Sequence, residues 1–174
     1  MLGAFGCVAH GKFPELVAAG VTIGLGTDAA AISRFLDLVR VMYLAACAHK
    51  DVHFDAEIMG AHKAFEMATI DGAHGLLWDD EIGSIEEGKL ADLVIVDRRN
   101  WEWQPRPDFN PIANLVYSAS GASVRDVMID GRMILRNRTL TSVDLAKIQG
   151  NIQEASAEAM SMAGIAAQVV WPTE

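Results

Sequence analysis

Residues 21–30 read VTIGLGTDAA and place one carboxylate, Asp28, just after a short apolar run. The run at residues 21–25 is β-branched and apolar with little alternation, which is typical of a parallel strand covered on both faces. The preceding segment, PELVAAG at residues 14–20, has Pro in its first turn and Gly20 as a stop signal, which indicates a helix. Because ligands bind at the carboxyl ends of such strands, we expect Asp28 to serve a functional site.

The segment after Asp28 predicts helices. In SRFLDLVRVMYLAACAHK (residues 33–50), apolar residues recur at i, i+3, i+4, i+7, i+8 and i+11, and Ser33 is the expected N-cap. A second helix is expected over roughly residues 56–69, and Asp71 is expected to cap a short third helix that ends at Leu76. This order of helix, strand and further helices indicates a piece of an α/β architecture.

From Trp78 onward the pattern favours strands. IGSIEEGKLADLVIVD (residues 82–97) predicts two strands around a Gly-containing turn, and residues 110–118 predict another strand. VRDVMIDGRMILRN (residues 124–137) predicts a hairpin with Asp130 and Gly131 as its two-residue turn. From Ser142 a helix rich in Ala and polar residues is expected to run to about residue 167.

These elements are too few to complete a fold by themselves. One parallel strand cannot make a sheet, and the second part has too few strands to close on itself. The change of pattern places a boundary near residues 77–82. We therefore expect this α/β chain to be the terminal part of something larger.

Composition excludes several classes of partner. The net charge of −9 argues against nucleic acid, which requires clustered Lys and Arg. No basic start with a long apolar run marks a signal peptide, and no stretch approaches the roughly 20 apolar residues of a membrane span. Cys7 and Cys47 lie in apolar surroundings without CxxC spacing, which indicates a reducing compartment. We expect a cytoplasmic protein with no nucleic-acid or membrane partner.

Three segments together resemble the amidohydrolase superfamily, in particular its cytosine deaminase, s-triazine hydrolase and guanine deaminase-like branch. They are AGVTIGLGTDAA (19–30), AFEMATIDGAHGL (64–76) and DEIGSIEEGKLADLVIVD (80–97), and the hairpin at 124–137 fits the same family. The resemblance implies the end of a metal-dependent (β/α)8 barrel, followed by strands of a small β-sandwich and a C-terminal helix. These parts would be residues 1–77, 78–141 and 142–174, with 21–25 as the eighth barrel strand.

The resemblance also implies a chemistry. Such an enzyme hydrolyses a C–N bond (deamination) or a C–halogen bond of a heteroaromatic ring such as a purine, pyrimidine or s-triazine. One divalent ion, Zn or Fe, would make the attacking water acidic, and Asp28 would bind that ion and accept the proton. The local pattern alone leaves open that Asp28 merely caps the next segment.

The family's histidine ligands have no match here, because no His-x-His pair is present. His49 and His53 have the i, i+4 spacing that can put two imidazoles on one helix face, but cationic residues commonly end a helix in this way. His62 with Glu66 favours a helix-surface pair, and His74 favours a local hydrogen bond. None of these residues replaces the missing ligands, so this chain alone is expected to hold no complete metal site.

His10 and Lys12 lie close in sequence to the expected barrel mouth and are candidate substrate contacts. After Asp28 the chain departs from the family, because alanines occupy positions 29–31 where many members have Gly and then a Ser-Asn pair. The ring, the leaving group and the metal therefore stay open. The alternative function is a catalytically incompetent fragment or partner subunit. Such a chain would need the missing N-terminal barrel half, or would associate with itself as a homo-oligomer.

Overall fold

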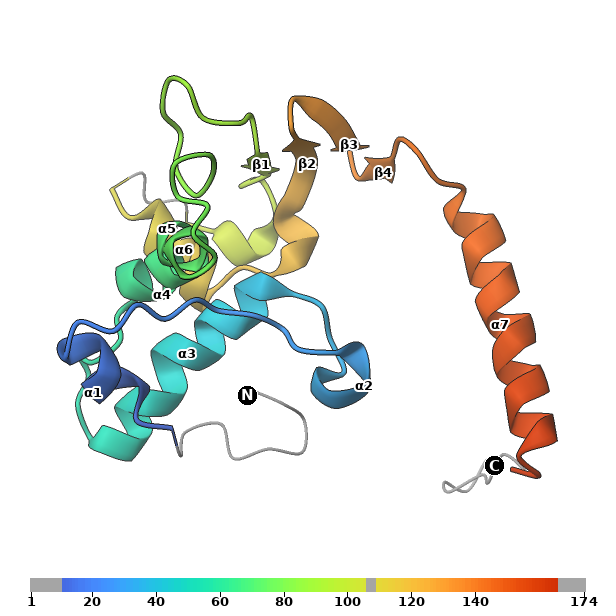
Figure 1. The fold of residues 1–174 in the computed structure, drawn as a ribbon, viewed down its shortest axis with the longest axis horizontal. Helices are drawn as coiled ribbons and strands as arrows, with labels where there is room; N and C mark the ends of the chain where they lie inside the picture. The colour runs from blue at the N-terminus through green and yellow to red at the C-terminus, as the bar shows by residue number, and fades with distance from the viewer. Residues whose placement is uncertain (1–10, 106–108, 166–174) are drawn as a thin grey trace. The chain divides into compact units, whose positions relative to one another are not determined.

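The computed structural model describes residues 11–105 and 109–165 (Figure 1). Contacts group the chain into two units, Met1–Arg138 and Thr139–Glu174. The helices of the first unit are α1 (Phe13–Ala18), α2 (Ala30–Ser33), α3 (Leu38–His53), α4 (Ala61–Met67), α5 (Ile70–Gly75) and α6 (Pro111–Tyr117), with short 3-10 turns η1 (Trp101–Trp103) and η2 (Gly121–Ser123). Its strands are β1 (Leu93–Val96), β2 (Val124–Ile129) and β3 (Arg132–Arg136). The second unit contains β4 (Thr139–Leu140) and α7 (Leu145–Met162).

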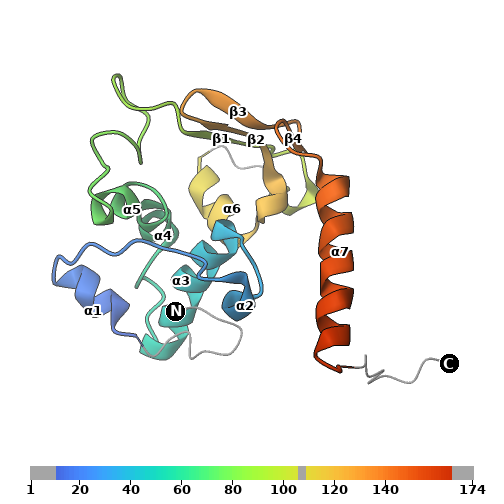
Figure 2. The ribbon, with the colours of Figure 1, turned by 45° about the vertical axis from the view of Figure 1, so that its right-hand side comes forward.

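The core of the first unit lies where α3, α4 and α6 pack against one another (Figures 1 and 2). Their apolar faces supply its buried side chains: Val39, Met42, Ala46, Ala61, Ala64 and Val116. Leu25, from the segment that precedes Asp28, packs against this cluster. The helices therefore form the support on which that segment rests.

Helix α3 begins later than its pattern predicts. Its N-cap is Asp37, whose Oδ1 accepts hydrogen bonds from the backbone N–H groups of Val39 (2.9 Å) and Arg40 (3.3 Å). Ser33 instead ends α2, and its buried hydroxyl donates to the carbonyl of Phe35 at 2.7 Å. The prediction of Ser33 as N-cap was wrong, because a carboxylate four residues on competes for the same role.

The next two helices also differ at their starts. Helix α4 begins at Ala61, and Thr69 occupies the N-cap position of α5 without a side-chain cap. Asp71 lies inside the first turn of α5, where its Oδ2 accepts from Nζ of Lys63 at 2.7 Å. The predicted capping role of Asp71 was therefore wrong, since the lysine on α4 holds that carboxylate.

The predicted strand at residues 21–25 is an extended run without strand pairing (Figure 1). The backbone N–H of Val21 donates to the carbonyl of Leu16, and that of Leu25 donates to the carbonyl of Met67, both at 2.9 Å. A parallel ladder needs neighbouring strands. The described part of the chain places none beside this run.

Strands β1, β2 and β3 form an antiparallel sheet in sequence order. The β2–β3 hairpin turns at Asp130 and Gly131, whose φ values of +48° and +72° confirm the predicted two-residue turn. The predicted strand before β1 is absent, because residues 81–92 form turns and coil; within them Gly83 lies against α5, where a Cβ would be 2.7 Å from Cβ of Ala73.

The strand predicted over residues 110–118 is helix α6 instead. The side chain of Asn110 accepts a hydrogen bond from the backbone N–H of Ala113 at 3.1 Å, and Pro111 occupies the first turn. Val116 is completely buried and belongs to the core cluster. A helix cap and a Pro at the first helical position outweigh the apolar run that favoured a strand.

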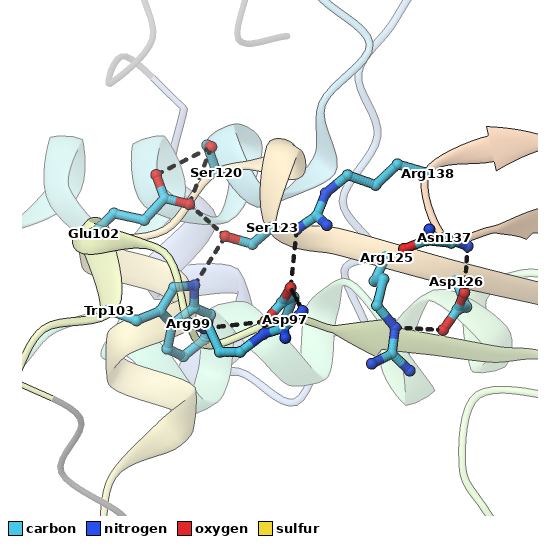
Figure 3. A network of polar contacts seen from close by, with 10 residues as sticks. All are labelled: Asp97, Arg99, Glu102, Trp103, Ser120, Ser123, Arg125, Asp126, Asn137 and Arg138. Atoms are coloured by element: carbon cyan, nitrogen blue, oxygen red, sulfur yellow. Dashed lines mark hydrogen bonds and ion pairs between the residues drawn. The ribbon is translucent and has the colours of Figure 1, made fainter.

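A polar network joins the sheet to η1 and η2 (Figure 3). Asp97 is buried at the end of β1 and accepts from Nη2 of Arg99 (2.8 Å) and Nη2 of Arg138 (3.3 Å). These hydrogen bonds, those from Arg99 first, hold the pKa of the Asp97 carboxyl well below its usual range. Close by, Nε1 of Trp103 donates to the Ser123 hydroxyl at 2.8 Å. The network fixes how the sheet meets the helical part.

The second unit is dominated by α7. Oδ1 of Asp144 caps it by accepting from the backbone N–H of Lys147 at 3.1 Å, and the helix ends at Met162. A helix is present where one was predicted from Ser142, but it begins at Leu145 and ends at Met162; residues 163–165 are not helical, and residues 166 and 167 lie outside the described residues. The predicted division of the chain into residues 1–77, 78–141 and 142–174 stays a prediction. No helix in residues 11–105 and 109–165 combines the length and apolar character needed to cross a membrane.

Candidate active site

Asp28 lies exposed at the end of the extended run. Its backbone has φ of +60°, and its Oδ1 accepts from the backbone N–H of Ala29 at 2.6 Å. Ala29 occupies the N-cap position of α2, and no side chain caps that helix. Within the described residues no donor contacts Oδ2. The carboxylate therefore does not cap α2 and keeps one oxygen available for another group.

The run that carries Asp28 is held by the α4–α5 segment. Besides the Leu25 to Met67 hydrogen bond, Gly24 touches α5 so closely that a Cβ on it would be 3.0 Å from Cα of Gly72. Gly83 lies against the same helix. The segments at residues 19–30, 64–76 and 80–97 are thus packed together, with α5 between the other two. The sequence pattern did not reveal this role for Gly24 and Gly72; the glycines themselves were the available signal.

The described residues do not make a complete metal site. Among them no group of three His, Cys, Asp or Glu side chains could hold a metal ion. Asp28 can supply one carboxylate oxygen, and a catalytic zinc site has three protein ligands. Any further ligands would have to come from outside the described residues.

Of the two candidate substrate contacts, Lys12 lies within the described residues. His10 lies outside the described residues. Lys12 is exposed at the N-cap position of α1, and its side chain does not cap the helix. The roles of both residues stay predictions.

Two of the remaining histidines, His53 and His74, contact neighbouring side chains. Nδ1 of His53 contacts the carbonyl of His49 at 2.9 Å, and its Nε2 lies 3.4 Å from Oε1 of Glu15. His74 lies 3.2 Å from Asp79, in line with its predicted local role. Glu66 forms its ion pair with Lys63 at 3.2 Å rather than with the predicted partner, His62.

His49 is the buried member of this set. It is 2% exposed, and the ring of Phe13 meets it edge-on with centroids 5.6 Å apart. Burial lowers the pKa of its imidazole; the charge of His53 lowers it further, while Glu15 opposes both. The neutral ring is therefore favoured in this surrounding.

In the first unit, a helix and an extended run that ends in an exposed carboxylate are followed by packed helices and a small antiparallel sheet. The chain belongs to the amidohydrolase family, whose model matches residues 11–134. This match confirms the resemblance found in the sequence.

The chain is also similar in sequence to individual deaminases and hydrolases. The chain is 38% identical over 143 residues to a 5-methylthioadenosine/S-adenosylhomocysteine deaminase of Acetivibrio thermocellus, covering 82% of this chain and 33% of the relative. It is 37% identical over 164 residues to an S-triazine hydrolase of Gordonia rubripertincta, covering 92% and 34%. The chain thus spans about a third of the length of these curated relatives.

Solved structures show the same likeness. An adenosine deaminase from Xanthomonas campestris with bound zinc matches with a TM-score of 0.81 and 35% identity, over 85% of this chain and 33% of that one. An atrazine chlorohydrolase from Arthrobacter aurescens, complexed with zinc, matches with a TM-score of 0.75 and 26% identity, over 82% and 31%. The predicted α/β fold class is confirmed, and zinc occurs in structures of this family.

Proposed function

We propose that this chain forms the C-terminal part of a metal-dependent amidohydrolase that cleaves a C–N or C–halogen bond of a heteroaromatic ring. The observation that supports it most is the family match over residues 11–134 together with the exposed Asp28 carboxylate at the end of the extended run. The substrates after which the relatives are named, methylthioadenosine, S-adenosylhomocysteine and s-triazines, support a purine or triazine ring. We also propose a cytoplasmic location, on the two cysteines without CxxC spacing.

In this proposal Asp28 accepts a proton from the attacking water and can return it to a leaving amine. A divalent ion, when bound, lowers the pKa of water toward neutrality; zinc is favoured by the two zinc-containing structures, and iron stays an alternative from the sequence. The free Oδ2 suits Asp28 to both metal contact and proton acceptance. His10 and Lys12 remain proposed substrate contacts.

One observation favours a second candidate function. No three metal-ligating side chains come together within residues 11–105 and 109–165. The chain alone would then be catalytically incompetent, and would act only with the barrel half that carries the histidines or as a partner subunit. The two candidates are compatible, because the first concerns the enzyme that this chain would help to form and the second concerns the chain by itself.

A chimera tests the proposed function. This chain replaces the matching third of the A. thermocellus deaminase, and the product is assayed for zinc content, for ammonia release from 5-methylthioadenosine and for chloride release from a chlorinated s-triazine. We expect zinc binding and hydrolysis of one of these rings. Asp28→Asn should lower kcat by about 10²- to 10⁴-fold, the usual contribution of a general base.

Asp51→Asn is the matched control, because Asp51 is an exposed carboxylate on α3 and should leave kcat unchanged. A folded, zinc-loaded chimera that keeps full activity with Asn at position 28 would refute the role of Asp28. The isolated 174-residue chain should bind no stoichiometric zinc and show no hydrolysis. Activity of that chain alone would eliminate the second candidate.

A further inference from the structure

Helix α7 is exposed along its whole length, and its apolar side chains form one stripe. The stripe repeats every seven residues in two interleaved series, at positions 145, 152 and 159 and at positions 148, 155 and 162. This spacing is the a and d pattern of a helix that packs lengthwise against another helix. The side chains of this α7 stripe are Leu145, Ile148, Ile152, Ala155, Ala159 and Met162.

The α7 stripe needs a partner. Its four larger side chains are 52%, 40%, 58% and 82% exposed, in the order Leu145, Ile148, Ile152 and Met162. Most of the stability of a helix in a protein comes from packing of its apolar face, and Gly150 in the middle of α7 weakens the helix further. The family match ends at residue 134, before α7 begins, and so does not identify what the stripe contacts.

The sizes along the α7 stripe fit a second copy that runs in the opposite direction. Its first three side chains are large, and Ala155 and Ala159 follow them. In an antiparallel pair a position of one series meets a position of the other, so residues 148 and 152 face residues 159 and 155 of the second copy. Each of these layers then holds one isoleucine and one alanine, which fills the interface evenly. A parallel pair would set alanine against alanine in two layers and leave space between the helices unfilled.

The charges on α7 favour the same direction. Lys147 lies near the start of the helix, whereas Glu154 and Glu158 lie in its second half. Antiparallel pairing brings the lysine of one copy beside the glutamates of the other. It also sets the positive end of each helix dipole beside the negative end of its neighbour, whereas a parallel pair would bring like ends together.

We propose that α7 pairs antiparallel with α7 of a second copy of this chain, through the α7 stripe. The layers of isoleucine and alanine form the centre of the interface, and Leu145 of each copy meets Met162 of the other at the two ends. A helix of 18 residues is about 27 Å long, so the buried surface is small and the dimer is weak and reversible. The proposal rests on α7 alone and does not depend on the proposed hydrolytic function.

Disulfide formation between copies tests the direction of pairing. Leu145→Cys and Met162→Cys are made separately in the full chain with Cys7→Ser and Cys47→Ser, and one of them carries a tag so that mixed dimers separate on a gel. Each is incubated alone, and the two are incubated together, in a glutathione redox buffer at increasing protein concentration. We expect mixed dimers to dominate and to increase with concentration, because identical positions lie about 25 Å apart in the antiparallel pair. Disulfides that form equally well in each variant alone would overturn the proposal.

Two lysine variants show whether the α7 stripe causes the pairing. Ile152→Lys puts a charge into the stripe and should lower the association constant measured by mixed disulfide formation about a hundredfold, since each dimer loses two buried isoleucines. Gln153→Lys adds the same charge one residue further on, outside the stripe, and should leave the yield unchanged. Lysine is a good helix former, so circular dichroism should show the same helix content in both variants. Equal yields from the two variants would overturn the proposal, because another surface would then join the copies.

Discussion

Gly24 places the run that carries Asp28, because this glycine lies almost against Gly72. We expect Gly24→Ala to destabilise the first unit by about 1–3 kcal/mol, the usual cost of overpacking, since its Cβ would meet the backbone of α5 at 3.0 Å. Gly26→Ala is the matched control, as nothing lies within 4 Å of its Cβ position. That change should be neutral or stabilise by about 0.4–1 kcal/mol. Urea unfolding measures both.

Equal effects of the two alanine substitutions would contradict this account of Gly24. They would mean that any alanine in the run lowers the free energy of unfolding, whether or not its Cβ meets α5. In the active chimera, Gly24→Ala should also lower kcat, because the displaced run carries Asp28 four residues further on.

Asp97 makes stability depend on pH in the acid range. Its folded pKa is lowered, so its contribution is complete above the ordinary carboxyl pKa of about 4 and is lost as the pH falls through the folded value. Asp126 adds in the same direction, because hydrogen bonds from the backbone N–H of Asn137 and from Arg125 lower its pKa too. We expect Asp97→Asn to lower the urea midpoint at pH 7 and to lower it less at pH 2.5.

Asp51→Asn controls for the loss of an exposed negative charge. It should shift the urea midpoint little at either pH, since surface charges contribute little. A difference between wild type and Asp97→Asn that stayed constant from pH 7 to pH 2.5 would show that the Arg99 and Arg138 contacts do not act through the charge of Asp97.

At the scale of elements, local signals predicted some structures and misled for others. The β2–β3 hairpin was predictable because Asp130 and Gly131 determine their own turn. Helix α6 was missed because its apolar run fits a strand equally well, and the Asn110 cap, Pro111 and the packing against α3 and α4 together select the helix. The run at residues 21–25 has the composition of a β-strand. It is unpaired because a hydrogen-bonded ladder needs neighbouring strands, which a local sequence pattern cannot provide.

The cap of α6 can be tested directly. Removing the Asn110 side chain eliminates its hydrogen bond with the backbone N–H of Ala113, so Asn110→Ala should cost about 1 kcal/mol in the free energy of unfolding. Asn100→Ala is the control, because Asn100 occupies the N-cap position of η1 without a side-chain cap bond. Chemical denaturation compares the two. A cost for Asn100→Ala as large as for Asn110→Ala would show that the cap does not account for the loss.

At the scale of the whole molecule, order along the chain predicted more than any single residue. The family, the fold class and the position of Asp28 after the run all follow from the order of the segments at residues 19–30, 64–76 and 80–97 along the chain. The Gly24–Gly72 contact could not be predicted, because it joins segments far apart in the chain. The same limit applies to the metal site: the sequence identifies one carboxylate, and the described residues add no cluster to it.

The exposed apolar surface leads to a prediction about association. Leu76, Leu77 and Trp78 follow one another at the end of α5 and are 70%, 89% and 55% exposed. Consecutive exposed apolar side chains of this size mark a contact surface. We therefore propose that the chain self-associates, or binds the remaining barrel half, through surfaces that include this segment.

Light scattering after size-exclusion chromatography should show a mass that rises with loading concentration. Leu76→Lys should weaken association roughly tenfold, because burial of one leucine is worth about 1.5–3 kcal/mol. The substitution should not disturb the fold, because a cation at the end of α5 favours the helix. Ala56→Lys adds the same charge at an exposed alanine and should leave association unchanged. Either lysine makes the net charge of −9 less negative and so lowers the electrostatic repulsion between two copies of the chain. Weaker association in Leu76→Lys alone would therefore come from the lost apolar contact. A single monomeric mass at every concentration would refute self-association of the isolated chain.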